Sequence, residues 1–196
     1  MLSKINYTVL AVFAAGLLAT SGDITMTWTS PTYSKLYSND TSINPIGRPI
    51  TSSEDGWIGS LINIGAMIGP LPYSYIAERF GRRIGLLSIS IPHMTAYLIF
   101  AFANKVYLFY LGRLLGGLAV GGGYTLLPMY IAEVSDDSNR GLLSSCLMPF
   151  WAFGNFLPYA LGPFISIKVF NLILACFPVS FFIIFLLFGV ETPYYF

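Results

Sequence analysis

Nine of the 19 charged side chains of this sequence fall in three short segments. Glu78 to Arg83 reads Glu-Arg-Phe-Gly-Arg-Arg, Glu133 to Arg140 holds three acids and an arginine, and Glu191 begins the third segment near the C-terminus. Arginine side chains cap the terminal carbonyls of helices and pair with carboxylates of neighbouring helices, and a glycine permits a left-handed turn between them. If the three segments meet at one end of a helical bundle, they form an ion-pair network that one conformation makes and another breaks.

We therefore predict a conformational gate built from these charges. A plain anchoring role for cations at a membrane surface would explain the arginines, but not the acid, the glycine and their spacing together. The residues expected in this inner gate are Glu78, Arg79, Arg82, Arg83, Glu133, Arg140 and Glu191.

Other kinds of chemistry find no support in the residue pattern. No nucleophile, base and orienting group converge, so we expect no enzyme, no cofactor and no metal site. Cys146 and Cys176 both lie in apolar runs, which favours two buried small side chains over a disulfide or a metal site. With 10 Lys and Arg against 9 Asp and Glu, the chain has no basic face, so binding of nucleic acid is not expected.

The elements that must position these charges are membrane-spanning helices. Of the 196 residues, 55% are hydrophobic and only 10% are charged, and the mean hydropathy is +0.69. A soluble globular domain carries about 25% charged residues, so a soluble enzyme is excluded. One crossing of a bilayer takes roughly 20 apolar residues. The runs of that length predict an all-α membrane protein with six transmembrane helices at residues 5–28, 57–77, 84–103, 106–131, 141–167 and 169–190.

The positions of the cations predict the orientation of these helices. The links at 103–105 and 166–168 are very short and force helical hairpins, whereas one link at about 29–56 is long and polar. Lysine and arginine in short links are retained in the cytoplasm, and three arginines fall within residues 78–83. We expect an integral protein of the plasma membrane, with both ends cytoplasmic and the long link extracellular.

Two further features bear on this topology. Asn39-Asp40-Thr41 is an N-glycosylation sequon in the long link, so Asn39 is a candidate glycosylation site on the outside. A signal peptide is the alternative interpretation of the first apolar run, because Ala19 to Gly22 offers small residues. That run is longer than the usual stretch of about 7 to 15 residues, and only Lys4 precedes it.

Two charges are predicted inside the spans. Counted from the inner end, Asp23 lies about 27 Å up the first span, and Arg113 lies about 10 Å down from the outer end of the fourth. Ionisable residues at membrane depth are costly and are usually paired or functional, so we expect a static charge pair, with proton coupling as the alternative. His93 is expected to be packed or hydrogen-bonded rather than a proton relay.

Together these motifs resemble the sugar porter family of the major facilitator superfamily. The resemblance rests on Glu78 to Arg83, Gly112-Arg113, Pro128 to Ser135 (PMYIAEVS) followed by Arg140-Gly141, and the terminal Glu-Thr-Pro-Tyr-Tyr. Within that family the sequence looks most like the insect facilitated trehalose and glucose transporters. The match follows the order and spacing of the motifs over nearly the whole chain. It corresponds to the N-terminal six-helix half of a twelve-helix transporter, with the C-terminal half absent.

Departures from the family pattern concern the substrate site. The family commonly has a sugar-binding Gln eight residues after the arginine of the Arg-Gly pair, where this chain has Met148, at best a weak acceptor. Val190 and Tyr194 replace a Pro and an Arg around the terminal motif, so one gate cation is missing. Trp151 and Asn155 lie three and seven residues after Met148, on roughly the same helix face near the midplane. These three are candidate substrate-binding residues, with plain packing and an interhelical hydrogen bond as the alternative.

The resemblance implies a function and partners. It implies transport of a hexose or a trehalose-like sugar by alternating access, with a small-molecule sugar and the lipid bilayer as partners. One half alone cannot build a cavity at the interface of two halves, so the C-terminal half or a second subunit is needed. The alternatives are a truncated, non-transporting membrane protein that associates with a full-length carrier, and a proton-coupled sugar symporter.

Overall fold

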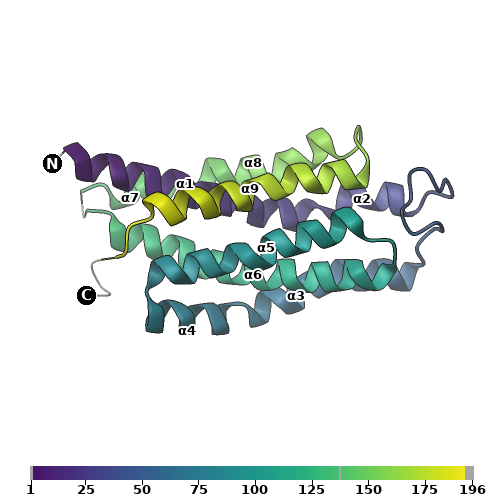
Figure 1. Cartoon of the computed structure of the whole chain (residues 1–196), viewed down its shortest axis with the longest axis horizontal. Coiled ribbons are helices and arrows are strands. Elements are labelled where there is room, and N and C mark those ends of the chain that lie inside the picture. Colours follow the sequence, from purple (N-terminus) through teal and green to yellow (C-terminus); the bar gives the residue numbers. More distant parts are fainter. Residues whose placement is uncertain (1, 137, 193–196) are drawn as a thin grey trace.

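The chain folds into a bundle of helices that run roughly along one axis (Figure 1). The computed structural model describes residues 2–136 and 138–192. Within these residues there is no strand, and the helices are α1 (Leu2–Thr27), α2 (Thr29–Leu36), α3 (Ser52–Ile68), α4 (Pro70–Phe80), α5 (Arg82–Phe102), α6 (Val106–Val134), α7 (Arg140–Ser145), α8 (Leu147–Leu161) and α9 (Ile167–Phe188).

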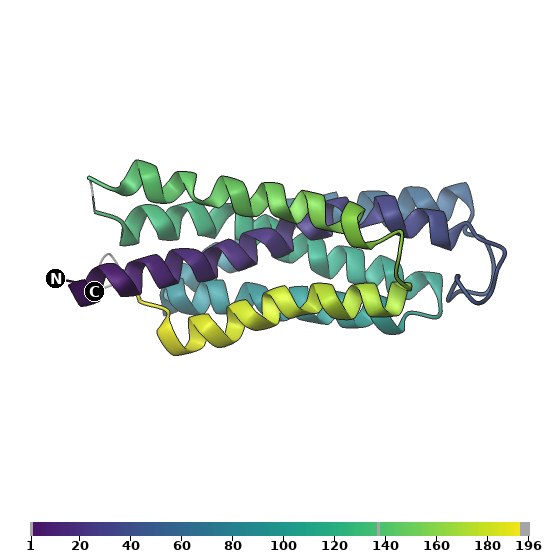
Figure 2. The ribbon, with the colours of Figure 1, turned by 90° about the horizontal axis from the view of Figure 1, so that it is seen from above.

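The start of α1 and the segment after α9 lie at the same end of the bundle (Figures 1 and 2). We call this the inner end, because the sequence predicts that it faces the cytoplasm, and the opposite end the outer end. The links between α5 and α6 and between α8 and α9 lie at the outer end (Figure 2).

Four stretches are long and apolar enough to cross a membrane by length and composition. They are Val9–Leu36, which joins α1 to α2, and the helices α5, α6 and α9. The spans predicted at 57–77 and 141–167 are each divided in two, at Gly69 and at Cys146. Both residues keep right-handed helical backbone angles, so α3–α4 and α7–α8 each follow one bent path. The all-α membrane class is confirmed, and the count of six spans stays a prediction.

The polar link at the outer end is shorter than the predicted 29–56. Helix α2 extends to Leu36, and α3 begins at Ser52 because Thr51 and Glu54 form a capping box around its first turn. Hydrogen bonds from Arg48 to the Glu54 carboxylate stabilise its charged form and lower the pKa of Glu54 to about 2. The irregular link therefore covers residues 37–51.

The seam between α3 and α6 is built on glycine. A Cβ at Gly65 would lie 2.4 Å from the backbone oxygen of Leu114, and one at Gly69 would lie 2.2 Å from that of Leu118. These two helices pack more extensively than any other pair. Small residues permit such close approach in a membrane, where van der Waals contact replaces the hydrophobic effect as the driving force.

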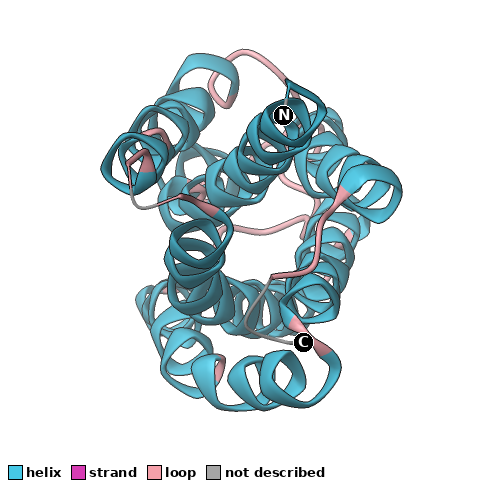
Figure 3. Cartoon of the chain, turned by 90° about the vertical axis from the view of Figure 1, so that its left-hand side faces the viewer, coloured by secondary structure: helices cyan, strands magenta, loops and turns pink. Residues whose placement is uncertain are grey.

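Two apolar clusters fill the inner and outer halves of the bundle. The inner cluster includes Leu18 and Leu126, and the outer one includes Trp28, whose ring stacks 4.2 Å from that of Phe100 between centroids. Figure 3, which looks along the bundle from the inner end, shows the helices around this core. The buried polar side chains that separate the two clusters along α1 and α5 are Thr20, Ser21, Asp23, Ser90 and His93.

Replacing Gly117 on α6 with alanine tests the glycine seam. A Cβ there would lie 2.3 Å from the backbone oxygen of Ile62, so we expect Gly117→Ala to destabilise the fold by about 1 to 3 kcal/mol. Gly123, also buried on α6, meets nothing closer than 3.9 Å, and Gly123→Ala should match or exceed the wild-type midpoint. Thermal denaturation in detergent measures both variants, and equal midpoints would contradict the seam.

Candidate functional site

Asp23, towards the outer part of α1, is the centre of a polar cluster. The residue is only 4% exposed. Its Oδ1 accepts a hydrogen bond from the phenol of Tyr124 on α6, and its Oδ2 accepts one of 2.6 Å from the side-chain amide of Asn155 on α8. Gly154 permits this approach, because a Cβ there would lie 2.9 Å from that of Asp23. One carboxylate therefore joins α1 to two other helices.

An aromatic surface lies beside this carboxylate. The ring centroids of Tyr124 and Trp151 are 5.7 Å apart, and both rings line a small cavity between α1, α5, α6 and α8. His93 lines the same cavity, and its Nδ1 lies 3.5 Å from the hydroxyl of Thr25. The cavity volume of about 10 Å³ has room for at most one water molecule. The described residues therefore enclose no space for a sugar at this cluster.

The structure brings two of the three predicted substrate-binding residues to this cluster. Asn155 contacts Asp23, and Trp151 contacts Tyr124. Met148 lies one turn before Trp151 on α8 and is 64% exposed. Like Asp23 and Asn155, it is not among the residues lining the cavity. An amide and a carboxylate next to an aromatic ring suit a polar ligand that offers hydroxyl groups and one apolar face.

Tyr124 is a member of the Asp23 cluster that the sequence pattern did not predict. It lies eleven residues after Arg113, which is three turns along the same face of α6. The position of Tyr124 on the same helix face as the charged Arg113 is the feature of the sequence that could have indicated it. The hydroxyl of Tyr124 binds Asp23, and 43% of the side chain stays exposed.

Arg113 and Asp23 have separate partners. The Arg113 guanidinium donates to the backbone oxygen of Ile58 at 2.9 Å and to that of Thr25 at 2.6 Å, and it lies over the ring of Trp28. Thr25 is in the last turn of α1, where carbonyls lack helical partners and the helix dipole favours a cation. The described residues contain no ion pair between Arg113 and Asp23, so the expected static pair is not formed in this conformation.

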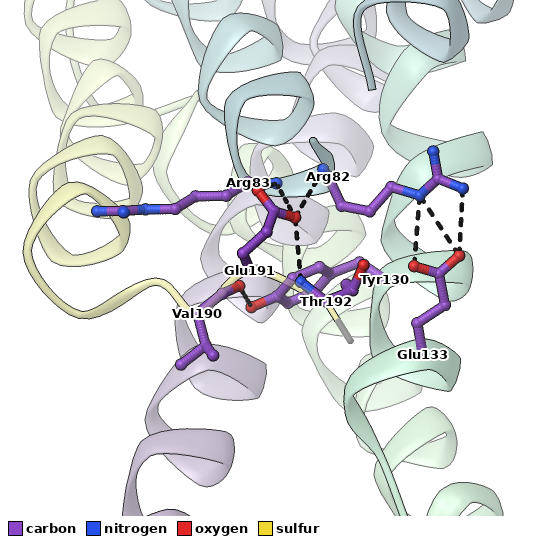
Figure 4. Close-up of polar contacts among 7 residues, drawn as sticks. All are labelled: Arg82, Arg83, Tyr130, Glu133, Val190, Glu191 and Thr192. Carbon is purple, nitrogen blue, oxygen red and sulfur yellow. Dashed lines mark hydrogen bonds and ion pairs between the residues drawn. The ribbon is translucent and has the colours of Figure 1, made fainter. Parts of the chain in front are cut away.

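At the inner end, the Glu191 carboxylate binds the N-terminus of α5 (Figure 4). It accepts hydrogen bonds from the backbone N–H of Arg82 at 2.8 Å and from that of Arg83 at 3.2 Å. The first N–H groups of a helix have no partner within it, and the helix dipole favours an anion there. Gly81 makes the turn with φ of 96°, and a Cβ at Gly81 would lie 2.3 Å from Oε2 of Glu191. Both the turn and the carboxylate therefore require glycine.

The two arginines that follow Gly81 connect this contact to other helices. Arg82 forms an ion pair with Glu133 on α6, with 3.3 Å between Nε and Oε2 and both side chains largely buried. Arg83 extends the other way and donates to a backbone oxygen near the end of α9 at 2.7 Å. The phenol of Tyr130 donates to the backbone oxygen of Val190 at 2.8 Å (Figure 4). Helices α5, α6 and α9 are thus tied together at the inner end.

The remaining members of the predicted gate lie at the same end with other partners. Arg79 donates to a tyrosine phenol one turn earlier at 2.7 Å, and Arg140 donates to a backbone oxygen in the last turn of α6 at 3.1 Å. Glu78 is exposed, and the described part of the chain holds no ion pair for it. Tyr194, with the rest of the terminal motif after Thr192, lies outside the described residues.

The sequence resembles those of known membrane carriers. The family model described as "Sugar (and other) transporter" matches residues 8–196. Mouse solute carrier family 2, facilitated glucose transporter member 8 is 29% identical over 184 residues, which are 94% of this chain and 38% of that protein. Sugar transporter ERD6-like 6 of Arabidopsis thaliana is 36% identical over 144 residues, 74% of this chain and 29% of that protein. The chain therefore spans less than two fifths of the length of these relatives.

The fold is shared with solved structures of the major facilitator superfamily. The partially occluded, inward-open xylose transporter XylE of E. coli matches with a TM-score of 0.77 and 22% identity, over 96% of this chain and 51% of that one. A second structure, of the proton:xylose symporter XylE bound to 6-bromo-6-deoxy-D-glucose, matches with a TM-score of 0.78 over 98% of this chain and 46% of that one. At this identity the likeness shows the fold alone, which is the N-terminal helical bundle.

A double-mutant cycle tests the pairing at the inner end. We expect Arg82→Ala and Glu133→Ala to be coupled by roughly 1 kcal/mol in stability, because each single change already removes the same partly buried ion pair. The matched control pairs Arg83→Ala with Glu133→Ala. Arg83 binds α9, so that cycle should be additive within about 0.5 kcal/mol. Thermal denaturation in detergent gives the free energies, and additivity in the first cycle would contradict the ion pair.

Proposed function

The chain belongs to the sugar transporter family, and we propose that it forms the N-terminal half of a carrier that moves a sugar across a membrane by alternating access. The observation that carries the proposal is the family match over residues 8–196. The proposed carrier needs a second half or a second subunit, because substrate cavities of this class lie between two repeats. A relationship to the insect trehalose and glucose transporters stays a prediction.

We assign the substrate site to the cluster around Asp23. Both N–H groups of the Asn155 amide donate within the protein, to Asp23 and to the backbone oxygen of Trp151, so its Oδ1 is the atom that accepts from a sugar hydroxyl. The ring of Trp151 offers a stacking surface for the apolar face of a sugar ring. The cavity in this half holds no more than a water molecule, so the second half supplies the opposite wall. Met148 lies on the exposed face of α8. In this proposal it contacts the substrate only if the second half covers that face.

The contacts at the inner end form the proposed gate. Glu191 on the N-terminus of α5 and the pair of Arg82 with Glu133 hold one conformation, and opening towards the cytoplasm releases them. Such contacts suit a switch because they are few, polar and confined to helix ends, so an alternative packing can replace them.

Proton coupling is the second candidate, and one observation favours it. Asp23 is buried at membrane depth without a cationic partner among the described residues. An intramembrane carboxylate of this kind is by default a functional group, and proton relays use such groups. In this version of the proposal Asp23 takes up the proton while the phenol of Tyr124 and the amide of Asn155 hold it in place.

Sugar uptake tests the proposed function. The complete reading frame that contains this chain, reconstituted in liposomes, should show saturable uptake of at least one labelled sugar from a panel of glucose, xylose and trehalose. Asn155→Ala removes one hydrogen-bonding amide and should raise the half-saturation concentration about fivefold, whereas Asn104→Ala, in the exposed α5–α6 link, should not.

The same assay separates the alternatives. Accumulation driven by a pH gradient, and lost in Asp23→Asn, would establish a symporter. Uptake that does not depend on the pH gradient would establish a facilitator. If the complete protein moves none of the sugars in a broad panel, or if Asn155→Ala matches the Asn104→Ala control, the proposed substrate site is wrong.

Glycosylation tests the proposed orientation in the plasma membrane. Asn39 is exposed in the outer link, so in eukaryotic membranes it should carry one glycan that peptide N-glycosidase removes, and Asn39→Gln should abolish the mass shift. Asn6-Tyr7-Thr8 is a second sequon near the opposite end of α1, and Asn6→Gln is the matched control that should change nothing. If the glycan is lost in Asn6→Gln, the orientation is the reverse of the one proposed. An unglycosylated chain would contradict the assignment of Asn39.

A further inference from the structure

A shallow apolar groove lies on the outside of the bundle near its outer end. Its volume is about 370 Å³, and it is lined by Thr95, Leu98, Ile99 and Phe102 of α5 and Leu108 of α6. The four residues of α5 have the i, i+3, i+4, i+7 spacing of one helix face and extend over about 10 Å. The hydroxyl of Thr95 donates to a backbone oxygen of its own helix at 2.8 Å. The groove therefore presents almost only apolar surface to the membrane.

Two lysines stand at the outer rim of this groove. The ammonium nitrogen of Lys168, in the first turn of α9, lies 5.1 Å from the ring centroid of Phe102. Lys105 precedes α6, and its backbone oxygen accepts a hydrogen bond from the N–H of Leu108 at 3.1 Å, so it lies one turn before this groove residue. Its ammonium nitrogen lies 5.9 Å from the ring centroid of Tyr107, outside the groove, and is within reach of a phosphate at the rim only by turning about its side-chain bonds. Neither lysine forms an ion pair within the described residues. Lysines in short links are generally found on the cytoplasmic side, so two lysines in links at the outer end are unusual.

We propose that this groove is a phospholipid site, in which an acyl chain lies along α5 from Phe102 to Thr95 and the phosphate binds Lys168 and Lys105. The occupant must be apolar at membrane depth and anionic at the rim, and a phospholipid combines both. A second copy of this chain fits less well. The acids near the start of α3 at the outer end already have partners, since Glu54 binds Arg48 and the Asp55 carboxylate accepts from a tyrosine phenol.

The proposal depends on insertion in a membrane and not on sugar transport. A lysine near a lipid phosphate at the membrane surface strengthens binding about fivefold. One bound lipid would contact α5, the link to α6 and the start of α9 at once. It would therefore stabilise the outer end, where no ion pair connects these three helices within the described residues.

Native mass spectrometry of the purified chain tests the site. Phosphatidylglycerol and phosphatidylcholine should each give one retained adduct, whereas a diacylglycerol with the same acyl chains, which lacks the phosphate, should be retained at least about tenfold less. The double variant Lys105→Gln/Lys168→Gln should lower phospholipid retention by about tenfold or more. Arg48→Gln removes a cation at the same end but away from the groove, and it should leave retention unchanged.

A second pair of variants tests the acyl chain. Leu98→Trp fills the groove and should abolish the adduct, whereas Leu187→Trp, on an exposed face of α9 outside the groove, should not. Equal retention of diacylglycerol and phospholipid would overturn the proposal, as would normal retention in the lysine double variant. Loss of the adduct in the lysine variant without loss in Leu98→Trp would also overturn it, because the acyl chain would then lie elsewhere.

Photo-crosslinking keeps the test independent of how the variants fold. A phospholipid with a diazirine in its acyl chain should label the unsubstituted protein at residues 95–108. Unlabelled phospholipid should chase this label, and diacylglycerol should not. Labelling spread evenly over the exposed helix faces would contradict a defined site.

Discussion

The contact between the Glu191 carboxylate and the N-terminus of α5 organises the inner end of this protein. The carboxylate takes backbone N–H groups that the helix cannot satisfy itself, and it fits only because residue 81 has no Cβ. Since Glu191 uses the backbone, the side chains of Arg82 and Arg83 remain available to α6 and α9. One hydrogen-bonded carboxylate thus decides how three helices meet, and a change at this point alters all of them together.

Helix α6 links that end of the bundle to the polar cluster in its middle. It carries Tyr124, which binds Asp23, and Glu133, which binds Arg82 about 14 Å further along the helix. In the proposed carrier, a shift of α6 relative to α1 and α5 therefore reaches the substrate site and the gate at the same time. The small volume of the mid-bundle cavity agrees with a substrate site shared by two halves, in which this half provides one wall and the second half closes the space.

Sequence patterns predicted the helices well, because a long apolar run in a membrane has few alternatives to a helix. They did not predict which prolines interrupt a helix. The interruptions at Gly69 and Cys146 lie just before Pro72 and Pro149, which lack the N–H that would bond the carbonyl four residues earlier, whereas other prolines lie inside continuous helices. The sequence patterns placed Asp23 and Arg113 in the membrane but not their partners. Buried charged groups need hydrogen-bond partners. Arg113 has backbone oxygens as partners, and Asp23 has a phenol and an amide, so neither needs the other. Only the packing of neighbouring helices selects among such donors and acceptors.

In the proposed carrier the inner contact holds one conformation and opens during transport, and hydrogen–deuterium exchange at the start of α5 measures this opening. As the first amides of α5, those of Arg82 and Arg83 lack a partner within the helix, so their protection reports on Glu191 alone. In the complete carrier without sugar, these amides should exchange slowly, and a saturating transported sugar should accelerate exchange there while the middle of α5 stays protected. Equal exchange with and without sugar would contradict the claim.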